Sequence, residues 1–94
     1  MRLVKIVPSP NAAKKWRAIF EDDGHESHTD FGSAGMDDFT ITKNPLQAEH
    51  YRTRHAKDLK TGDPTRAGFL SYYILWSSPN MRANIAAYKN KFNL

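Results

Sequence analysis

The order of apolar and polar residues along this chain has a period of two in the first half and a helical period in the second. Residues 1–7 alternate loosely and are rich in β-branched side chains, which is typical of a half-buried strand. Residues 15–20 alternate more clearly, with Trp16, Ala18 and Phe20 on one face and cations on the other. The pattern predicts two strands at the start of the chain.

Turn residues divide the rest of the first half into short segments. The pair at 23–24 is Asp-Gly, which tolerates the positive φ angles of a tight hairpin turn, and a strand is expected over residues 26–32. A glycine-containing turn at 32–35 precedes residues 38–42, where Phe39 and Ile41 would lie on the same face of a further short strand. The first half therefore reads as an antiparallel meander.

A helix start follows at Asn44, where the side chain can cap the first turn and Pro45 suits the first helical position. Gln47 stands where a capping-box residue would reach back to the cap. The pattern predicts a helix that continues to about Asp58 with a thin apolar stripe. The residues expected on its inner side are Leu46, His50, Tyr51 and Arg54.

Two more helices are expected toward the end of the chain. Residues 67–76 form the most hydrophobic segment, and their aromatic side chains recur at spacings of three and four, which predicts a short buried helix. A cap-plus-proline signal at 78–79 begins a final amphipathic helix, whose apolar residues repeat at helical spacing from Met81 to Phe92.

These elements predict the fold class α+β, with an antiparallel β-meander of three or four strands followed by three helices packed on it. We expect one domain over residues 1–94, made of an N-terminal strand and turn (1–13), the meander (14–42) and a helical half (44–94). The late aromatic side chains are expected to be used in packing; a water-accessible pocket lined by these rings and by converging ionisable groups would instead indicate an enzyme. The expected core residues are Trp16, Phe20, Phe31, Phe39, Ile41, Phe69, Leu75, Trp76, Ile85 and Tyr88.

Composition narrows the function classes. The 94 residues include no cysteine, so disulfides and thiolate metal sites are excluded. The longest apolar run, 72–76, is far too short to span a bilayer, and the start of the chain has no signal-peptide pattern. The net charge is +4, with acids concentrated at 21–38 and bases dominant from Lys43 onward. The basic half favours an anionic partner or simply keeps the protein in solution.

Imidazole and carboxylate groups gather in the acidic segment 21–30, which includes His25 and His28. Such groups can bind a divalent metal ion, but an odd separation along a strand points the two rings to opposite faces. We favour a hydrated acidic turn and keep a metal site as the alternative. His50 and His55 lie about 140° apart around a helix and cannot easily share a ligand, so His50 is expected to cover the edge of the core rather than to act in catalysis.

Motifs for catalysis are not found. The sequence has no Gly-x-Ser-x-Gly elbow, and the glycine pair Gly32 and Gly35 is not followed by the Lys-Ser or Lys-Thr of a phosphate-binding loop. We therefore expect a non-enzymatic protein with no cofactor and no small-molecule substrate.

A basic stretch begins at Tyr51 and is a candidate partner-binding surface. Its cations could clamp phosphates, although they are expected to wrap around the helix rather than to line one stripe. The alternatives are a solvated basic face and a contact with another protein. The candidate partner-binding residues, including one aromatic from the later helix, are Tyr51, Arg52, Arg54, Lys57, Lys60, Arg66 and Tyr73.

Four segments in fixed order carry a resemblance: residues 15–20, 30–40, 51–55 and 68–76. They include a Phe-Gly turn, a Tyr-x-x-Arg-His helix and a Leu-Trp pair before Ser-Ser-Pro. Together they resemble a family of small uncharacterised proteins encoded by nucleocytoplasmic large DNA viruses, such as those that infect algae and amoebae. The likeness spans roughly residues 14–92.

The resemblance implies a virion component, and in particular a minor capsid protein lying between or beneath capsomers. Its partners would then be other viral capsid proteins, and its location the virion, with the host cytoplasm or nucleus during assembly. The resemblance carries over no catalytic residue. The alternative is a basic nucleic-acid-binding protein associated with the viral genome.

Overall fold

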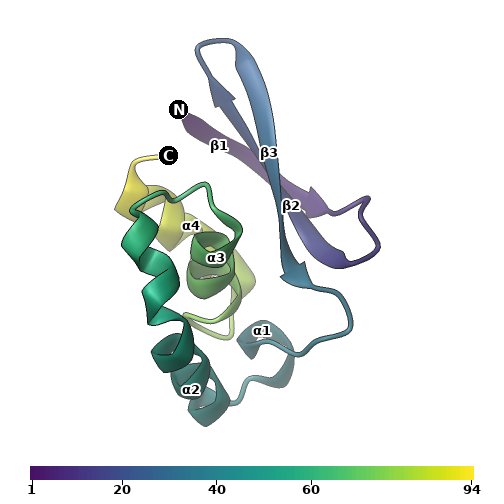
Figure 1. The fold of residues 1–94 in the computed structure, drawn as a ribbon, viewed down its shortest axis with the longest axis vertical. Coiled ribbons are helices and arrows are strands. Elements are labelled where there is room, and N and C mark those ends of the chain that lie inside the picture. Colours follow the sequence, from purple (N-terminus) through teal and green to yellow (C-terminus); the bar gives the residue numbers. More distant parts are fainter.

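A three-stranded antiparallel sheet followed by helices confirms the α+β prediction. The computed structural model describes residues 1–94, and its strands β1 (Arg2–Pro8), β2 (Lys14–Asp22) and β3 (His25–Ser33) lie in the order β1-β2-β3. Figure 1 shows the β2–β3 hairpin extending to one end of the long axis while the helices gather at the other. The molecule measures 41 × 27 × 22 Å.

The hairpin turn has the geometry that its sequence predicts. Asp23 and Gly24 both have positive φ, 52° and 81°, as a two-residue type I′ turn requires. Asp22 pairs with His25 directly beside the turn, and the pairing between β2 and β3 then runs without a register shift. The local turn chemistry therefore determines the register of the hairpin.

The predicted strand at 38–42 is wrong, because the sheet ends at Ser33 and this segment forms the one-turn helix α1 (Phe39–Thr42). The Asp38 carboxylate caps the helix by accepting the Thr40 N–H. In so short a segment, alternation cannot be told from a single helical turn. Phe39 is buried, but Ile41 is 56% exposed, so the expectation of Ile41 in the core is also wrong.

The helix α2 (Pro45–His55) begins where it was predicted and continues as the 3₁₀-helix η1 (Ala56–Thr61). The Asn44 side chain accepts the N–H groups of the first turn, as expected. The expected reach-back of Gln47 is wrong, because its side-chain oxygen accepts the Thr42 hydroxyl at 2.8 Å and Thr42 itself accepts the N–H of the cap residue.

The inner side of α2 is narrower than the sequence suggested. Ala48 is fully buried, and Tyr51 and His55 are half-buried at the following helical positions. This stripe follows the i, i+3, i+7 spacing of one helix face. The expected inner face is wrong at three positions, which are exposed: Leu46, His50 and Arg54.

The predicted helix over 67–76 exists, but its second half is wider than a regular α-helix. After α3 (Ala67–Leu70) the chain forms a π-helix, η2 (Ser71–Leu75). Side chains outside the π-helix donate hydrogen bonds to the backbone carbonyl groups at its C-terminal end. These donors are the Ser77 hydroxyl to Tyr73 (2.6 Å), the Asn84 amide to Ile74 (2.8 Å) and the Arg52 guanidinium to Trp76 (2.5 Å).

The last helix, α4 (Met81–Phe92), starts later than predicted. Its cap is Asn80, whose side chain accepts the Ala83 N–H at 3.0 Å, rather than Ser78. Ser78 instead donates its hydroxyl to the buried Asn84, so it helps to hold the loop before the helix.

The core joins the sheet to the helices. Most of the expected core residues are buried, while Trp16 and Ile85 pack against its edge. Gly32, at the end of β3, has a φ of +77°, and a Cβ there would lie 2.8 Å from a methyl group of Leu75. The sheet therefore approaches the π-helix closely at this point. The core cluster is Leu3, Ala18, Phe20, Phe31, Phe39, Ala48, Leu70, Ile74, Leu75, Trp76 and Tyr88.

No helix of the structure combines the length and the apolar character that a bilayer crossing requires.

Candidate functional site

A groove of about 600 Å³ lies between one end of the sheet and the helices. One wall contains the start of β2 and residues 32–38, and the other contains α2 and η1. Leu75 and Trp76, which are almost fully buried, form its apolar base. Several ionisable side chains converge on this groove, so their partners determine what it can do. Of the late aromatic side chains, only Trp76 lines it, so the groove is not the ring-lined pocket that would indicate an enzyme.

Three stacked rings lead from the core to the groove. The Trp76 and Tyr51 rings lie 4.1 Å apart and nearly parallel, and the His55 ring stacks on the other face of Tyr51 at 4.0 Å. Burial raises the pKa of the Tyr51 phenol, and the nearby Asp58 carboxylate raises it further. Both faces of Tyr51 are thus covered, and its phenol stays neutral.

The outer ring of the stack is held by a carboxylate. The Nδ1 of His55 lies 3.1 Å from an oxygen of Asp58, and this is the only hydrogen bond of the ring. Gly68 makes room for the pair, because a Cβ at that position would lie 3.0 Å from the Cβ of Asp58. A histidine oriented by a carboxylate can serve as a general base, but here no hydroxyl or amine is hydrogen-bonded to the ring.

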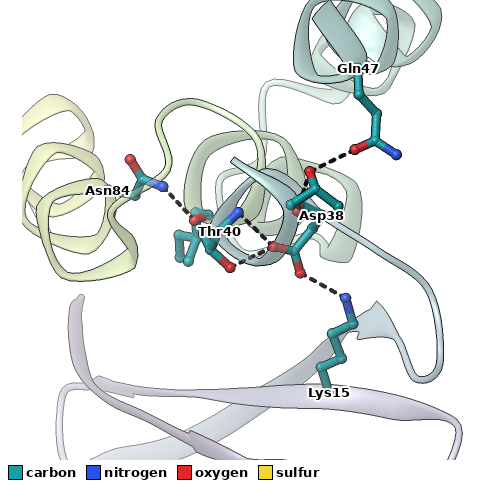
Figure 2. A network of polar contacts seen from close by, with 7 residues as sticks. Lys15, Asp38, Thr40, Gln47 and Asn84 are labelled. Carbon is teal, nitrogen blue, oxygen red and sulfur yellow. Dashed lines mark hydrogen bonds and ion pairs between the residues drawn. The ribbon is translucent and has the colours of Figure 1, made fainter. Parts of the chain in front are cut away.

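A buried ion pair closes one end of the groove. Figure 2 shows Lys15 reaching from β2 to the Asp38 carboxylate, 2.7 Å away, and the two side chains are only 15% and 2% exposed. The other oxygen of Asp38 accepts both the N–H and the hydroxyl of Thr40. Both oxygens are used, so this carboxylate connects the sheet to α1.

Three charged groups of the groove have no such partner. Lys14 stands at the start of β2, and Arg54 stands on α2 on the opposite wall. Neither forms a salt bridge or a side-chain hydrogen bond, and the same is true of Asp37. The unpaired groups are thus two cations and one carboxylate, in a lining that holds three Lys and Arg side chains and three Asp side chains.

Of the predicted partner-binding residues, some support the fold and others face solvent. Tyr51 belongs to the ring stack, and Arg52 donates to the Trp76 carbonyl. Tyr73 is half-buried and packs edge-on against the Phe92 ring. The exposed remainder, which we call the basic helical surface, is Arg54, Lys57, Lys60 and Arg66.

The 3₁₀-helix arranges part of the basic helical surface. With three residues per turn, it places Lys57 and Lys60 in one row rather than around the helix. The expectation that the cations wrap around the helix is wrong for these two. No member of the surface forms a salt bridge, so all four charges are free for a partner.

The four histidines do not come together. His25 and His28 lie on β3, exposed and an odd number of positions apart, and no group of three His, Asp or Glu side chains is placed to hold a metal ion. His50 is exposed, so the expectation that it covers the edge of the core is wrong. His55, in the ring stack, is the one that the structure brings into the groove.

The sequence did not single out the groove itself. Its main contributors, Lys14, Asp38 and Asp58, come from three segments that only the fold brings together. Gly68 was one indication of it in the sequence, because a glycine inside a helical pattern often marks a place where another segment packs closely.

A family model for a family of unknown function (DUF5754) matches residues 4–55. The match runs from β1 to the end of α2, so it includes most of the N-terminal strand and the α2 wall of the groove. Comparisons with curated proteins and with solved structures found no match. Since the matched residues make up more than half of the chain, the protein belongs to the DUF5754 family.

Proposed function

We propose that this protein is a non-enzymatic structural protein that docks against neighbouring protein subunits, as a minor capsid protein of a large DNA virus particle. The viral setting is supported by the resemblance of the segments 15–20, 30–40, 51–55 and 68–76. The docking role is supported by how the charged and aromatic side chains are distributed between the inside of the fold and its surface.

The observation that carries the proposal is that the groups resembling catalytic ones are engaged within the fold. Asp38 has its oxygens on Lys15 and Thr40, and His55 has its hydrogen bond to Asp58. No buried side-chain nitrogen or oxygen lacks a hydrogen-bond partner. Active sites usually keep polar groups aimed at a substrate, whereas these groups hold elements together.

The helical half offers the surface for docking. Residues 43–94 contain nine Lys and Arg side chains and three Asp and Glu, and none of the nine cations forms a salt bridge. Arginine is enriched at protein interfaces because its guanidinium can pair with carboxylates in a planar, two-bond geometry. The basic helical surface thus suits an acidic face of a neighbouring subunit.

The test is mass spectrometry of purified particles of the virus that encodes the protein, comparing shell with genome-bearing core fractions. We expect the protein in the shell fraction, with lysine cross-links from Lys57 or Lys60 to another capsid protein. Finding the protein only in infected cells and never in particles would overturn the proposal.

The second candidate function is nucleic-acid binding within the particle. It is favoured by the free cations of the basic helical surface, with Lys57 and Lys60 in one row. Binding through about four phosphate contacts requires affinity for DNA that falls steeply between low and physiological salt. No measurable DNA binding at low salt removes this candidate, and recovery of the protein in the core fraction would favour it over the shell.

A further inference from the structure

We infer that the free edge of β3 pairs with the same edge of a second copy of this chain, with residues 25–29 of the two copies antiparallel and Glu26 of each opposite His28 of the other. The contact joins the two three-stranded sheets edge to edge. This inference goes beyond the proposed function and does not depend on the viral setting.

The outer edge of β3 is a row of unpaired backbone groups. The strand order leaves β3 with β2 as its only neighbour, and Asp22 and His25 form the hydrogen-bonded pair beside the two-residue turn. The backbone groups of residues 26, 28, 30 and 32 therefore point away from β2. None of these residues takes part in the backbone hydrogen bonds made outside helices and strands.

The opposite edge of the sheet is protected against pairing, whereas the β3 edge is regular. A register shift interrupts β1 between Leu3 and Lys5, and the strand ends at Pro8, which has no N–H to donate. Bulges, lysines and prolines are the usual means of blocking an edge strand. β3 has nine residues without a bulge, a lysine or a proline, so its charged side chains decide which strand can pair with it.

The accessible part of this edge is the half beside the turn. Residues 25–28 are exposed, and Figure 1 shows this end of the hairpin extending away from the helices. From Thr29 onward the strand is covered, because the Thr29 hydroxyl donates to the Thr65 carbonyl at 2.7 Å and Phe31 is buried. A second strand therefore finds an open edge beside residues 25–29.

The side chains of this stretch complement a second copy of it. Antiparallel pairing about Ser27 places residue 26 opposite residue 28 twice, on the same face of the joined sheet. Glu26 and His28 form no salt bridge or side-chain hydrogen bond within the chain. An imidazole can donate a hydrogen bond to a carboxylate in either protonation state. Each copy thus supplies the partner that the other lacks.

The neighbouring charges select this register over a longer overlap. Pairing about Thr29 would place His28 opposite Asp30, but Asp30 already accepts two hydrogen bonds from Arg17, at 2.8 and 3.1 Å. Pairing about His28 would place Glu26 opposite Asp30, and like charges directly opposite are destabilising. Only the pairing about Ser27 brings together groups that are free and complementary.

The contact should be weak, because it is short. The two pairs of residues 26 and 28 exchange about four backbone hydrogen bonds, and the area buried is well below that of a standard interface. We expect a dissociation constant on the order of 0.1–1 mM. Such a contact becomes important where many copies are held close together.

The experiment is a concentration series of the isotope-labelled full chain, from about 0.05 to about 2 mM, followed through backbone amide NMR signals. We expect the amides of residues 25–29 to shift with concentration along one monomer–dimer curve, while those of α2 stay in place. Sedimentation equilibrium of the same samples measures the mass of the dimer.

A charge exchange tests the register. Glu26→Lys and His28→Glu should each weaken the dimer by about tenfold, because each change places like charges opposite one another twice. The double variant restores opposite charges and should dimerise within about threefold of the parent protein. The matched controls are Glu49→Lys and His50→Glu, the same changes at exposed positions of α2, and should have no effect beyond about twofold. Thermal unfolding of each variant shows whether a loss of dimer reflects a loss of fold.

Several results would overturn the inference. These are the absence of any concentration dependence up to about 2 mM, shifts on β1 or the basic helical surface instead of β3, single changes no stronger than their controls, and a double variant as weak as the single ones. Loss of the dimer with His28→Glu but not with Glu26→Lys would show the longer overlap instead. A dimer formed by a protein never found in particles would keep the inference and remove only the viral role.

Discussion

The sheet and the helical half satisfy their backbone groups in different ways. In the sheet, residues 2–33, the strands pair with one another, and β2 and β3 do so without interruption. The helical half, residues 39–94, combines the longer helices α2 and α4 with four short ones: a one-turn α1, the 3₁₀-helix η1, a one-turn α3 and the π-helix η2. Side chains satisfy backbone groups at the ends of several of these helices, long and short, and those side chains include Asp38, Asn44, Arg52, Ser77, Asn80 and Asn84.

The difference explains where polar residues matter for stability and where they are free for binding. In the sheet, charged side chains pair across the surface, as Arg17 does with Asp30 at 2.8 Å, and the backbone bonds do not depend on them. In the helical half, buried polar side chains hold the backbone, while the exposed cations form no salt bridges. Substitutions of the same kind should therefore have different effects in the two halves.

The two tryptophans give the largest expected contrast. Trp76→Ala should lower the free energy of unfolding by about 3–5 kcal/mol, because the ring is 7% exposed and supports the stack with Tyr51. Trp16→Ala, at the edge of the core, should cost about 2 kcal/mol. Urea unfolding of both variants measures the difference. A loss below about 1 kcal/mol for Trp76→Ala would contradict its place in the core.

The two kinds of ion pair come next. Asp38→Ala should cost about 3 kcal/mol, because it leaves Lys15 without its buried partner and removes the cap of α1. Glu21→Ala breaks only the exposed pair with Arg2 on the sheet and should cost less than about 1 kcal/mol. Urea unfolding of the two variants measures these losses of stability. Equal losses of unfolding free energy would show that Asp38 does not hold α1 to the sheet.

A pair of glycines tests the contact between the halves. Gly32→Ala should cost about 2 kcal/mol, because its φ of +77° is strained for alanine and the new methyl group would push Leu75. Gly24→Ala meets the same strain in open space and should cost about 1 kcal/mol. Thermal unfolding compares the two, and their difference measures how tightly β3 packs on the π-helix. Equal losses would mean that Leu75 moves aside freely.

The smallest effect concerns alkaline pH. Burial raises the pKa of the Tyr88 phenol above its ordinary 10.0, with a smaller contribution from Asp63, and its hydroxyl donates to the Pro64 carbonyl. In the unfolded chain this phenol ionises near pH 10 while in the folded protein it stays protonated. Its contribution to stability is therefore complete below pH 10 and is lost as the pH rises above that value.

Tyr88→Phe should cost about 1 kcal/mol at neutral pH through the lost hydrogen bond and should flatten the decline above about pH 10. Urea unfolding at several pH values measures both effects. Tyr72→Phe is the control, because the Tyr72 hydroxyl forms no hydrogen bond in the structure. A decline as steep as that of the parent protein would show that the Tyr88 phenol ionises alike in both states.

Local patterns were sufficient for the elements whose shape depends on neighbours in the chain. The Asp-Gly pair at 23–24 determined the hairpin, alternation marked β2, and Asn44 with Pro45 determined the start of α2. The same reasoning failed at 38–42, because one helical turn and a short strand share the same apolar pattern, and the Asp38 cap with its Lys15 partner decided between them.

The sequence by itself determined the α+β class, the meander, the order of the helices and the excess of positive charge in the second half. Only the tertiary structure decided that the middle segment turns into a helix, that α3 widens into a π-helix, and that a groove opens between the sheet and α2. The physical reason is one of distance along the chain. A turn or a cap depends on residues a few positions apart, whereas the groove depends on packing between segments such as β2 and α2 that lie more than 20 residues apart.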